Sequence, residues 1–341
     1  MKKTIFGFSL IGCGNIARMH ALAVEKLESG RLVGVYDYSR ERAEEFAKEF
    51  GCRAFSSVEE LLNSEETDIV NICTPSGLHA EQAVAAAYAK KHIVIEKPMA
   101  ITREQLDAVI DAVKENGVLV EVITQLRFTP AIIKLKQAID EGRFGRILYA
   151  DYRMKYYRSP EYYKSGGWRG TYSMDGGGAL MNQGIHGVDL IQYLLGGVKS
   201  VRAQCRTLLH EIEVEDTANI LVEYNCGAIG VIQGTTVAKP GYAREIEICG
   251  DKGTALIKED IIAKWDIEGE TVDFDAKSEF NSGSNPMDFS EYYHMLQLKD
   301  LTDAIVGTGK TLVDAQEGRK PVDIILAAYE SSKTDTKVEL V

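Results

Sequence analysis

The residues near the start of the chain have the types and spacing of a dinucleotide-binding site. Gly12 to Ala17 fits the pattern G-x-G-x-x-G/A, after a short apolar run and before a helical one. Gly12 permits a tight turn, Gly14 lets the main chain approach a pyrophosphate, and Ala17 lets the helix pack close to the strand. The N-terminus of that helix can then hold the phosphates.

Asp37 ends the second apolar run, Leu32 to Tyr36, at the offset where a carboxylate accepts hydrogen bonds from a ribose 2′-hydroxyl. Because this acid would repel a 2′-phosphate, we predict a preference for NAD over NADP, tempered by the nearby Arg40. A tight turn without a ligand is the alternative, and the combination of strand, helix, second strand and terminal acid favours the dinucleotide.

Glu96, Lys97 and Pro98 follow a strand candidate, and the proline restricts the turn in which the lysine lies. Ligands of doubly wound sheets bind at the carboxyl ends of the strands, so Lys97 is predicted to lie beside the cofactor. A lysine there could bind substrate or transfer a proton. A solvated lysine at a strand end is the structural alternative.

A glycine run, Gly176 to Gly178, leads into a predicted helix that carries Asn182 and His186. These two residues are four positions apart and should therefore share one face. Asp189 could lie beside the histidine ring or be a polar surface residue. A histidine with a purely structural role is the alternative for His186.

The stretch Tyr156 to Thr171 is crowded with aromatic residues and cations. Such a composition suits stacking on a sugar and holding a carboxylate or phosphate. A surface loop or a subunit contact is the alternative.

The elements that must position these residues divide into two domains, predicted as 1–125 and 126–341. Residues 1 to about 122 alternate strand-like and helical runs, which predicts a parallel, doubly wound sheet. The predicted strands are Ile5 to Ile11, Leu32 to Tyr36, Ile69 to Cys73, His92 to Ile95 and Val118 to Ile123. The fold class is therefore α/β, with a Rossmann domain first.

The second domain is predicted to contain an open, mostly antiparallel sheet, because several alternating or apolar runs lie between Val198 and Lys258. Residues 158–178 are expected to form a long loop, and Ala179 to Leu195 a helix. Helices are also expected over Phe289 to Val306 and Val322 to Ser332, the last of them packing back on the first domain. Residues 266–287 are polar and poorly patterned.

The composition argues against some classes of binding partner and indicates a cellular compartment. The chain has 39 basic and 51 acidic residues and a net charge of −12, which argues against nucleic acid or an anionic membrane as a partner. Six cysteines without a C-x-x-C pair indicate reduced thiols and a cytoplasmic protein. The apolar run near the N-terminus lacks the length of a signal peptide, and a membrane span is not expected.

Taken together, these motifs resemble those of the Gfo/Idh/MocA oxidoreductases in type and order. The resemblance covers nearly the whole chain: Gly12-x-Gly14-x-x-Ala17, Thr74-Pro75-x-x-x-His79, Glu96-Lys97-Pro98, and the glycine-rich helix with His186. It implies a hydride transfer between NAD(P) and a hydroxyl of a sugar or cyclitol. Lys97 would correspond to the lysine of the family's EKP motif, and His186 to the histidine that takes the substrate proton.

The resemblance and the residue patterns together give the expected site. The expected catalytic residues are Lys97, His186 and Asn182, and no metal is expected. The residues expected to bind NAD are Gly12, Gly14, Asn15, Ile16, Asp37, Arg40, Thr74, Pro75, His79, Glu96, Lys97, Pro98, Trp168 and Arg169. Those expected to bind substrate are Lys97, Arg158, Tyr163, Trp168, Arg169, Asn182 and His186.

Asn182 departs from several cyclitol-oxidising relatives, which carry an aspartate four residues before the histidine. A neutral amide cannot stabilise an imidazolium by charge. The MNxGxH form is more similar to the branch that oxidises the 3-hydroxyl of nucleotide-linked amino sugars. An Asn182→Asp change is therefore expected to raise activity at higher pH.

Two other functions remain as alternatives. One is a glycosidase that oxidises C3 transiently with bound NAD, which would produce no net NADH. The other is a non-catalytic NAD(P)-binding sensor or regulator, against which the presence of both Lys97 and His186 argues. A homodimer or homotetramer is predicted, because the second sheet has too few helices to cover both of its faces.

Overall fold

The computed structural model describes residues 4–270 and 290–340, and the contacts within that part of the chain divide it into two compact units. The first unit contains residues 1–125 and 290–319, and the second contains 126–289 and 320–341. Most of the polar stretch noted in the sequence, residues 271–289, lies outside the described residues. The boundary between the two units falls inside the last helix, Ala315–Thr334, after Arg319. That this helix packs back on the first domain stays a prediction.

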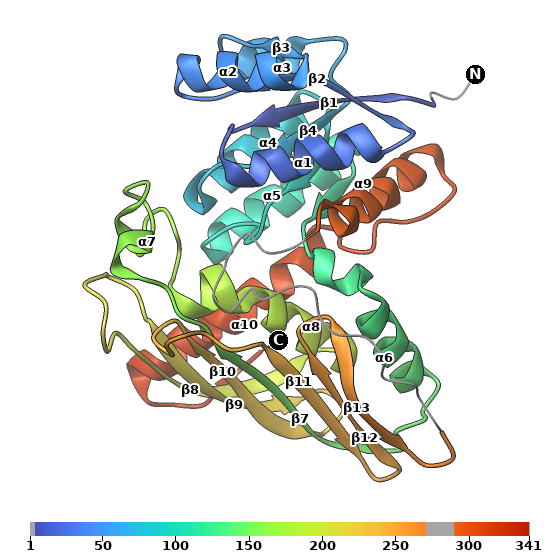
Figure 1. Ribbon diagram of the computed structural model, residues 1–341, viewed down its shortest axis with the longest axis vertical. Coiled ribbons are helices and arrows are strands. Elements are labelled where there is room, and N and C mark those ends of the chain that lie inside the picture. The colour runs from blue at the N-terminus through green and yellow to red at the C-terminus, as the bar shows by residue number, and fades with distance from the viewer. Residues whose placement is uncertain (1–3, 271–289, 341) are drawn as a thin grey trace. The chain divides into compact units, whose positions relative to one another are not determined.

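The sheet of the first unit is parallel. Within the described residues it has six strands in the order β3-β2-β1-β4-β5-β6, which is the order of the doubly wound dinucleotide fold (Figure 1). The strands are β1 Phe6–Ile11, β2 Gly30–Tyr36, β3 Arg53–Ala54, β4 Ile69–Ile72, β5 His92–Ile95 and β6 Val120–Val122. The predicted doubly wound sheet is therefore confirmed, and the two-residue β3 was missed because it is too short to show a pattern.

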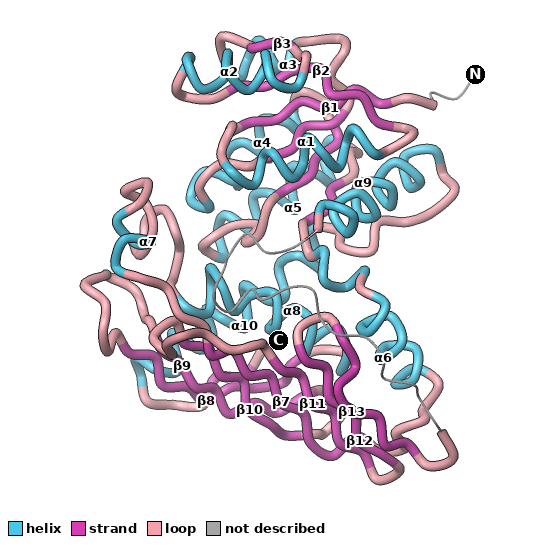
Figure 2. Tube along the Cα trace, viewed as in Figure 1, coloured by secondary structure: helices cyan, strands magenta, loops and turns pink. Residues whose placement is uncertain are grey.

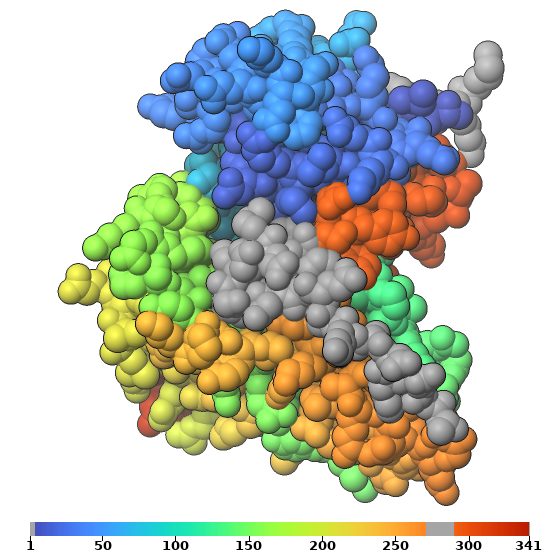
Figure 3. Space-filling model, in the orientation of Figure 1, coloured from blue at the N-terminus to red at the C-terminus, as the bar shows by residue number. Residues whose placement is uncertain are grey.

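Helices lie on both faces of this sheet. They are α1 Asn15–Lys26, α2 Arg40–Phe50, α3 Val58–Asn63, α4 His79–Tyr88, α5 Arg103–Asn116 and α9 Glu291–Val306, with a 3₁₀ turn η1 at Ser76–Leu78. Figure 1 shows α1 and α9 in front of the strands and α4 and α5 behind them. In Figure 3 the orange-red surface of α9 adjoins the blue surface of α1.

The core between the sheet and these two front helices explains why α9 joins the first unit. Leu298 and Leu301 of α9 are fully buried in one cluster with Phe8 of β1 and Val24 of α1. Burying a leucine side chain contributes about 2 kcal/mol, so α9 is held mainly by its apolar face. The sequence placed this helix correctly but gave no signal of which unit it completes.

The second unit is built on a mixed, mostly antiparallel sheet, as predicted. Within the described residues its order is β13-β12-β11-β7-β10-β9-β8-β14, and β10 and β7 form the parallel pair. The strands are β7 Ile147–Lys155, β8 Val198–Arg206, β9 Thr217–Tyr224, β10 Ile229–Thr235, β11 Glu245–Gly250, β12 Gly253–Lys258, β13 Ile261–Ile267 and β14 Val338–Glu339. The predictions missed β13 and β14, which contribute to the two edges of the sheet.

Among residues 4–270 and 290–340, helices cover one face of this sheet and leave the other uncovered. The helices of the unit are α6 Pro130–Asp140, α7 Pro160–Lys164, α8 Ile185–Leu195 and α10 Ala315–Thr334, with a 3₁₀ turn η2 at Gln125–Phe128 and a π-helical segment η3 at Ala179–Gly184. Figure 2 shows α8 and α10 on one side of the magenta strands. Along β9, Ile220 and Val222 are buried while Leu221 between them is 62% exposed.

Close packing of α8 on β7 requires a glycine. A Cβ at Gly187 would lie 1.9 Å from the ring of Tyr152, which is itself fully buried. This contact places the first turns of α8 directly on the covered face of the sheet.

Three local predictions in the second unit need correction. The predicted loop 158–178 contains the short helix α7, which Ser159 caps by accepting a hydrogen bond from the Tyr162 N–H. The predicted helix Ala179 to Leu195 begins as the π-helical segment η3. The last helix starts at Ala315 and contains Pro321, so the proline does not mark its beginning. Among the described residues, no helix is both long enough and apolar enough to cross a membrane.

Candidate active site

The glycine loop between β1 and α1 fits an anionic ligand. Gly12 has a φ of 96°, and a Cβ there would lie 2.7 Å from the Cys73 carbonyl oxygen, so a side chain is not tolerated. A Cβ on Gly14 would meet nothing within 4 Å, so the space before the loop is open. In the described structure, α1 starts with neither a side-chain cap nor an acid in its first turn. Its first N–H groups therefore fit the pyrophosphate of NAD.

Asp37 lies at the end of β2 and faces this loop. Its Oδ2 accepts a hydrogen bond from the Cys13 N–H at 2.9 Å, and its Oδ1 accepts one from the Ser39 N–H at 2.8 Å. The cation beside it is Arg42, whose guanidinium lies 3.4 Å from the carboxylate. Arg40, which the sequence suggested, instead pairs with Glu44 at 2.7 Å. The cation that would meet a 2′-phosphate is therefore Arg42.

His79 ties together the loops that follow β4 and β5. Its Nδ1 lies 2.7 Å from the Pro98 carbonyl oxygen, and its Nε2 lies 2.8 Å from that of Thr74. The ring is buried, and burial lowers its pKa against the opposing effect of the two carbonyls. In the structure, His79 therefore links the loops that follow β4 and β5. Its contact with the cofactor stays a prediction.

Lys97 follows β5 and the buried Glu96, and its side chain is half-buried. The Lys97 main-chain N–H donates to Glu96 Oε2 at 3.1 Å. The other carboxylate oxygen, Oε1, lies 2.9 Å from His20 Nε2 and 3.8 Å from His294 Nε2. The sequence prediction missed both histidines.

Asn182 and His186 lie on either side of the junction between η3 and α8. Both side chains are half-buried. The Asn182 Nδ2 donates to Asp175 Oδ1 at 2.6 Å, and its Oδ1 accepts from Gln183 Nε2 at 2.9 Å. Asp175 is buried and also accepts from the Gly170 N–H at 2.9 Å. A carboxylate that the sequence prediction overlooked therefore holds the amide of Asn182.

The Glu215 carboxylate accepts hydrogen bonds from main-chain N–H groups at the start of η3. Its Oε2 accepts from the Gly178 N–H at 2.9 Å, and its Oε1 accepts from the Leu180 N–H at 2.8 Å and from the Tyr329 hydroxyl at 3.0 Å. Burial raises the pKa of Glu215 to about 7, although these three donors oppose the rise. The π-helical segment thus begins on a buried carboxylate rather than on a side-chain cap of its own.

Asp189 is not the polar surface residue that the sequence allowed. It is buried, and its carboxylate pairs with the buried Arg127 through contacts of 2.6 and 2.8 Å. A buried ion pair with two hydrogen bonds compensates the desolvation of both groups. Asp189 therefore fixes α8 through Arg127, and a place beside the His186 ring stays a prediction.

The aromatic and cationic loop contacts the same π-helical segment. The Arg158 guanidinium is buried, and one of its nitrogens donates to Gln183 Oε1 at 2.8 Å. Gln183 Nε2 also donates to the Tyr162 hydroxyl at 2.8 Å, so Gln183 links this loop to Asn182. Burial lowers the pKa of Arg158.

The other predicted residues of the loop lie around the same tyrosine. Arg169 lies over the rings of Trp168 and Tyr162, at 4.7 and 4.8 Å. The Tyr163 hydroxyl is 2.8 Å from Thr236 Oγ1, and burial raises the pKa of Tyr163. The structure thus joins Arg158, Arg169 and the tyrosines into one cluster, as their predicted common role requires.

Comparison with known proteins identifies the family. Residues 6–124 match the oxidoreductase family with an NAD-binding Rossmann fold, and residues 132–256 match the GFO/IDH/MocA C-terminal domain. The chain belongs to the Gfo/Idh/MocA oxidoreductase family. The predicted family, the fold class and the NAD cofactor are thereby confirmed.

Similar solved structures and similar proteins of named activity agree with this family assignment. The chain is similar to the WlbA dehydrogenase from Bordetella pertussis in complex with NADH and UDP-GlcNAcA, with 32% identity, a TM-score of 0.91, and coverage of 100% of this chain and 99% of that one. It is 31% identical to levoglucosan dehydrogenase of Pseudarthrobacter phenanthrenivorans over 72% of each protein. It is 27% identical to myo-inositol 2-dehydrogenase of Thermotoga maritima over 76% of this chain and 78% of that protein.

These relatives confirm the predicted class of enzyme. This Gfo/Idh/MocA protein is an NAD-dependent oxidoreductase, and the relatives named above are dehydrogenases of a sugar derivative and a cyclitol. Its candidate catalytic residues lie in both units, with Lys97 in the first and Asn182 and His186 in the second.

Proposed function

We propose that this enzyme oxidises a secondary hydroxyl of a nucleotide-linked amino sugar, with UDP-GlcNAcA as the first candidate. The observation that carries the proposal is the likeness over the whole chain to WlbA dehydrogenase, whose structure contains NADH and UDP-GlcNAcA. The MNxGxH stretch with Asn182 supports the same branch, since cyclitol-oxidising relatives more often carry an acid there.

Lys97 and His186 are proposed to act on the same hydroxyl. When bound, NAD supplies the acceptor for the hydride. His186 accepts the hydroxyl proton, because the unperturbed pKa of imidazole lies near working pH. The positive charge of Lys97 holds the hydroxyl oxygen and stabilises the developing alkoxide. Asn182, held by Asp175 at 2.6 Å, orients the ring or the substrate.

The loop around Tyr162 is proposed to bind the anionic part of the substrate. Arg158 and Arg169 supply positive charge for a diphosphate or a carboxylate. Trp168 and Tyr163 supply aromatic surfaces for the sugar, and Trp168 with Arg169 is also assigned a contact with the nicotinamide. The Arg158–Gln183 hydrogen bond supports this role, because it couples the loop to the segment that carries Asn182.

A substrate screen tests the proposal. NAD reduction is measured with UDP-GlcNAcA, UDP-GlcNAc, levoglucosan and myo-inositol, and released UDP is measured in parallel. We expect the highest kcat/KM for UDP-GlcNAcA and net NADH formation without UDP release. Faster turnover of levoglucosan or myo-inositol would reject the nucleotide-sugar assignment, and UDP release without net NADH would replace oxidation with glycosidic cleavage.

The catalytic roles are tested by His186→Ala and Lys97→Ala. Each is expected to lower kcat by about 100-fold or more, the usual scale of general-base or oxyanion contributions, with little change in NAD affinity. Asn182→Ala should cost less. A Lys97→Ala enzyme with near wild-type turnover would refute the role given to Lys97.

We also propose that residues 1–125 bind NAD and residues 126–341 bind substrate and form a homodimer or homotetramer. The uncovered sheet face supports the oligomer, because Leu221 and Ile229 are 62% and 60% exposed there. The six cysteines, all free thiols in the described structure, support a cytoplasmic location. Light scattering at micromolar concentration tests the oligomer, and a monomeric mass would reject it.

A further inference from the structure

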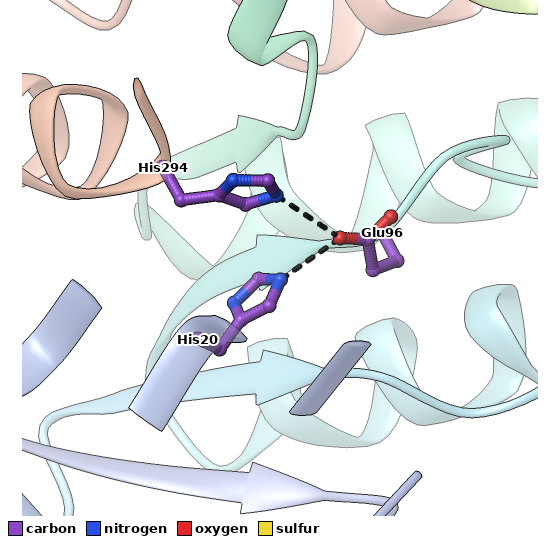
Figure 4. Close-up of side chains that lie close together, drawn as sticks. All are labelled: His20, Glu96 and His294. Carbon is purple, nitrogen blue, oxygen red and sulfur yellow. Dashed lines mark hydrogen bonds and ion pairs between the residues drawn. The ribbon is translucent and has the colours of Figure 1, made fainter. Parts of the chain in front are cut away.

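The cluster formed by His20, Glu96 and His294 lies inside the first unit, behind the candidate catalytic lysine. Figure 4 shows both imidazole rings directed at the same oxygen of Glu96. Both histidine side chains are fully buried, and that of Glu96 is 7% exposed. The three residues come from α1, from the end of β5 and from α9, so the cluster joins segments that are far apart in the sequence.

The two imidazoles compensate the burial of the carboxylate. Burial alone would raise the pKa of Glu96, yet the His20 hydrogen bond and the electrostatic interaction with His20 and His294 hold that pKa well below its usual range. An ionised carboxylate in a dry interior is expensive unless it is paired. Glu96 is therefore held by its partners, and loss of either partner leaves it poorly compensated.

The His20 ring and the helix that carries His294 are each held by hydrogen bonds. The Asn71 Nδ2 on β4 lies 3.0 Å from His20 Nδ1, so the ring accepts there and its Nε2–H donates to Glu96. On α9, Gln297 lies one turn after His294. It donates to Glu121 and to the Val122 carbonyl, both at 2.7 Å. The cluster is thus held by the Asn71 contact with the His20 ring and by the Gln297 hydrogen bonds that fix α9.

Glu96 transmits this fixation to Lys97. Its Oε1 faces the imidazoles while its Oε2 accepts the Lys97 main-chain N–H at 3.1 Å. A carboxylate clamped at one oxygen can hold the main chain of the next residue at the other. The direction of the main chain at Lys97 is therefore set, through Glu96, by two histidines that are fully buried inside the first unit.

We propose that His20 and His294 are positioning residues for Lys97, acting through Glu96. The inference rests on the proposed function, because it assumes that Lys97 acts on the substrate hydroxyl. A displacement of about 1 Å at a reacting group can cost about 100-fold in rate, so a clamp of this kind matters for turnover. It also gives α9 a role in catalysis besides its packing.

The same three residues could instead ligate a divalent cation, since their ligand atoms all lie within 4.8 Å of one another. The 2.9 Å separation of His20 Nε2 and Glu96 Oε1 is the length of a direct hydrogen bond. We therefore assign proton sharing, and metal binding is an outcome that the experiment must exclude.

The experiment compares His294→Gln with His294→Asn. The glutamine amide can take the place of Nε2, which lies 3.8 Å from Glu96 Oε1, whereas the asparagine amide ends near the position of Nδ1. Both residues are polar and small enough to be accepted. We expect His294→Asn to lower kcat by about tenfold or more while His294→Gln keeps most of it. The Kd for NAD should stay within about twofold in both variants.

His92→Asn is the matched control. His92 begins β5, four residues before Glu96, and its Nδ1 accepts the Leu119 N–H at 3.0 Å. An asparagine amide near the Nδ1 position can accept the same N–H, so this control replaces an imidazole of the same strand without changing the groups around Glu96. The control should keep wild-type kcat even if its Tm falls. Equal kcat in His294→Gln and His294→Asn, or an equal loss in His92→Asn, would overturn the proposal.

Two further measurements separate the remaining outcomes. Elemental analysis of the purified enzyme should find no stoichiometric zinc, manganese or iron, and a bound equivalent whose removal abolishes turnover would overturn the proposal in favour of a metal site. Lys97→Ala is assayed in the same series. If it keeps wild-type turnover, the proposed function fails; if it is inactive while the His294 variants match wild type, the positioning role alone fails.

Discussion

Replacing Glu215 with glutamine should change how the stability of the second unit depends on pH. Burial raises the pKa of Glu215 from 4.5 to about 7 in the folded protein. Because the folded pKa lies above the unfolded one, the folded state binds this proton more tightly. The stabilisation is complete below about pH 4.5 and is lost as the pH rises through about 7.

The size of this effect follows from the shift. One pKa unit corresponds to about 1.4 kcal/mol, so the wild type should lose roughly 3 kcal/mol of unfolding free energy across this range. Glu215→Gln cannot ionise and should lose none of it. The difference between wild type and variant should therefore shrink or reverse as the pH rises, while each protein alone also carries the effects of its other groups.

Tryptophan fluorescence during urea unfolding is a suitable assay, because Trp168 and Trp265 are the two tryptophans of the chain and both lie in the second unit. Glu213→Gln is the control, since it removes the same charge from an exposed carboxylate two residues away. It should keep the wild-type pH dependence. A stability difference between wild type and Glu215→Gln that stays constant from about pH 5 to about pH 8 would refute the reasoning.

Three other predictions concern the cofactor, the amide and the assembly. Asp37→Ala should raise the affinity for NADPH relative to NADH by about tenfold, because Arg42 is left without its opposing charge, and an unchanged ratio of the two dissociation constants would contradict this. Asn182→Asp should lower kcat/KM near neutral pH, since it would place a second carboxylate against that of Asp175, where the Asn182 amide now donates at 2.6 Å. The double variant that adds Asp175→Asn should recover activity, and no recovery across the pH profile would argue against this. Leu221→Lys should shift the enzyme toward monomers in light scattering, because it places a charge on the uncovered sheet face, and an unchanged mass would exclude that face as the interface.

The expectation for Asn182→Asp thus reverses between sequence and structure. From the sequence, a carboxylate at this position adds the charge that the site lacks. In the structure, Asp175 already places a buried carboxylate against the Asn182 amide. The pairing depends on how the loop folds back over η3, and the six residues between the two, a glycine run followed by the start of η3, give no periodic signal for it.

Much of the first unit could be predicted because its signals are local. The glycine turn, the alternation of strands and helices and the acid after β2 each follow from a few neighbouring residues. Thr102 likewise caps α5 as the sequence indicates, accepting the Gln105 N–H at 3.2 Å. In the second unit, the alternating runs expected between Val198 and Lys258 include β9, whose buried and exposed positions follow the strand period.

What could not be predicted depends on partners distant in the chain. The sequence from Ala179 onward predicts a regular α-helix. In the structure this segment instead starts as a π-helix, and Glu215 accepts hydrogen bonds from the N–H groups at its start. His294 looks like one polar residue in an amphipathic helix until α9 is placed against β6. Asp189 looks exposed until Arg127 is placed beside it.

Two buried carboxylates lie behind the candidate catalytic segments, and burial affects them with opposite results. Glu96 in the first unit has imidazole partners and a pKa well below its usual range. Glu215 in the second has two main-chain N–H groups and a phenol, and its pKa is raised to about 7. Neutral donors reduce the rise in the pKa of Glu215 that burial causes, but they do not cancel it. For Glu96, groups that can carry positive charge outweigh the effect of burial and lower the pKa. Glu96 is therefore a permanent anchor for Lys97, while the anchor of the Asn182 and His186 segment titrates near the pH at which the enzyme is expected to work.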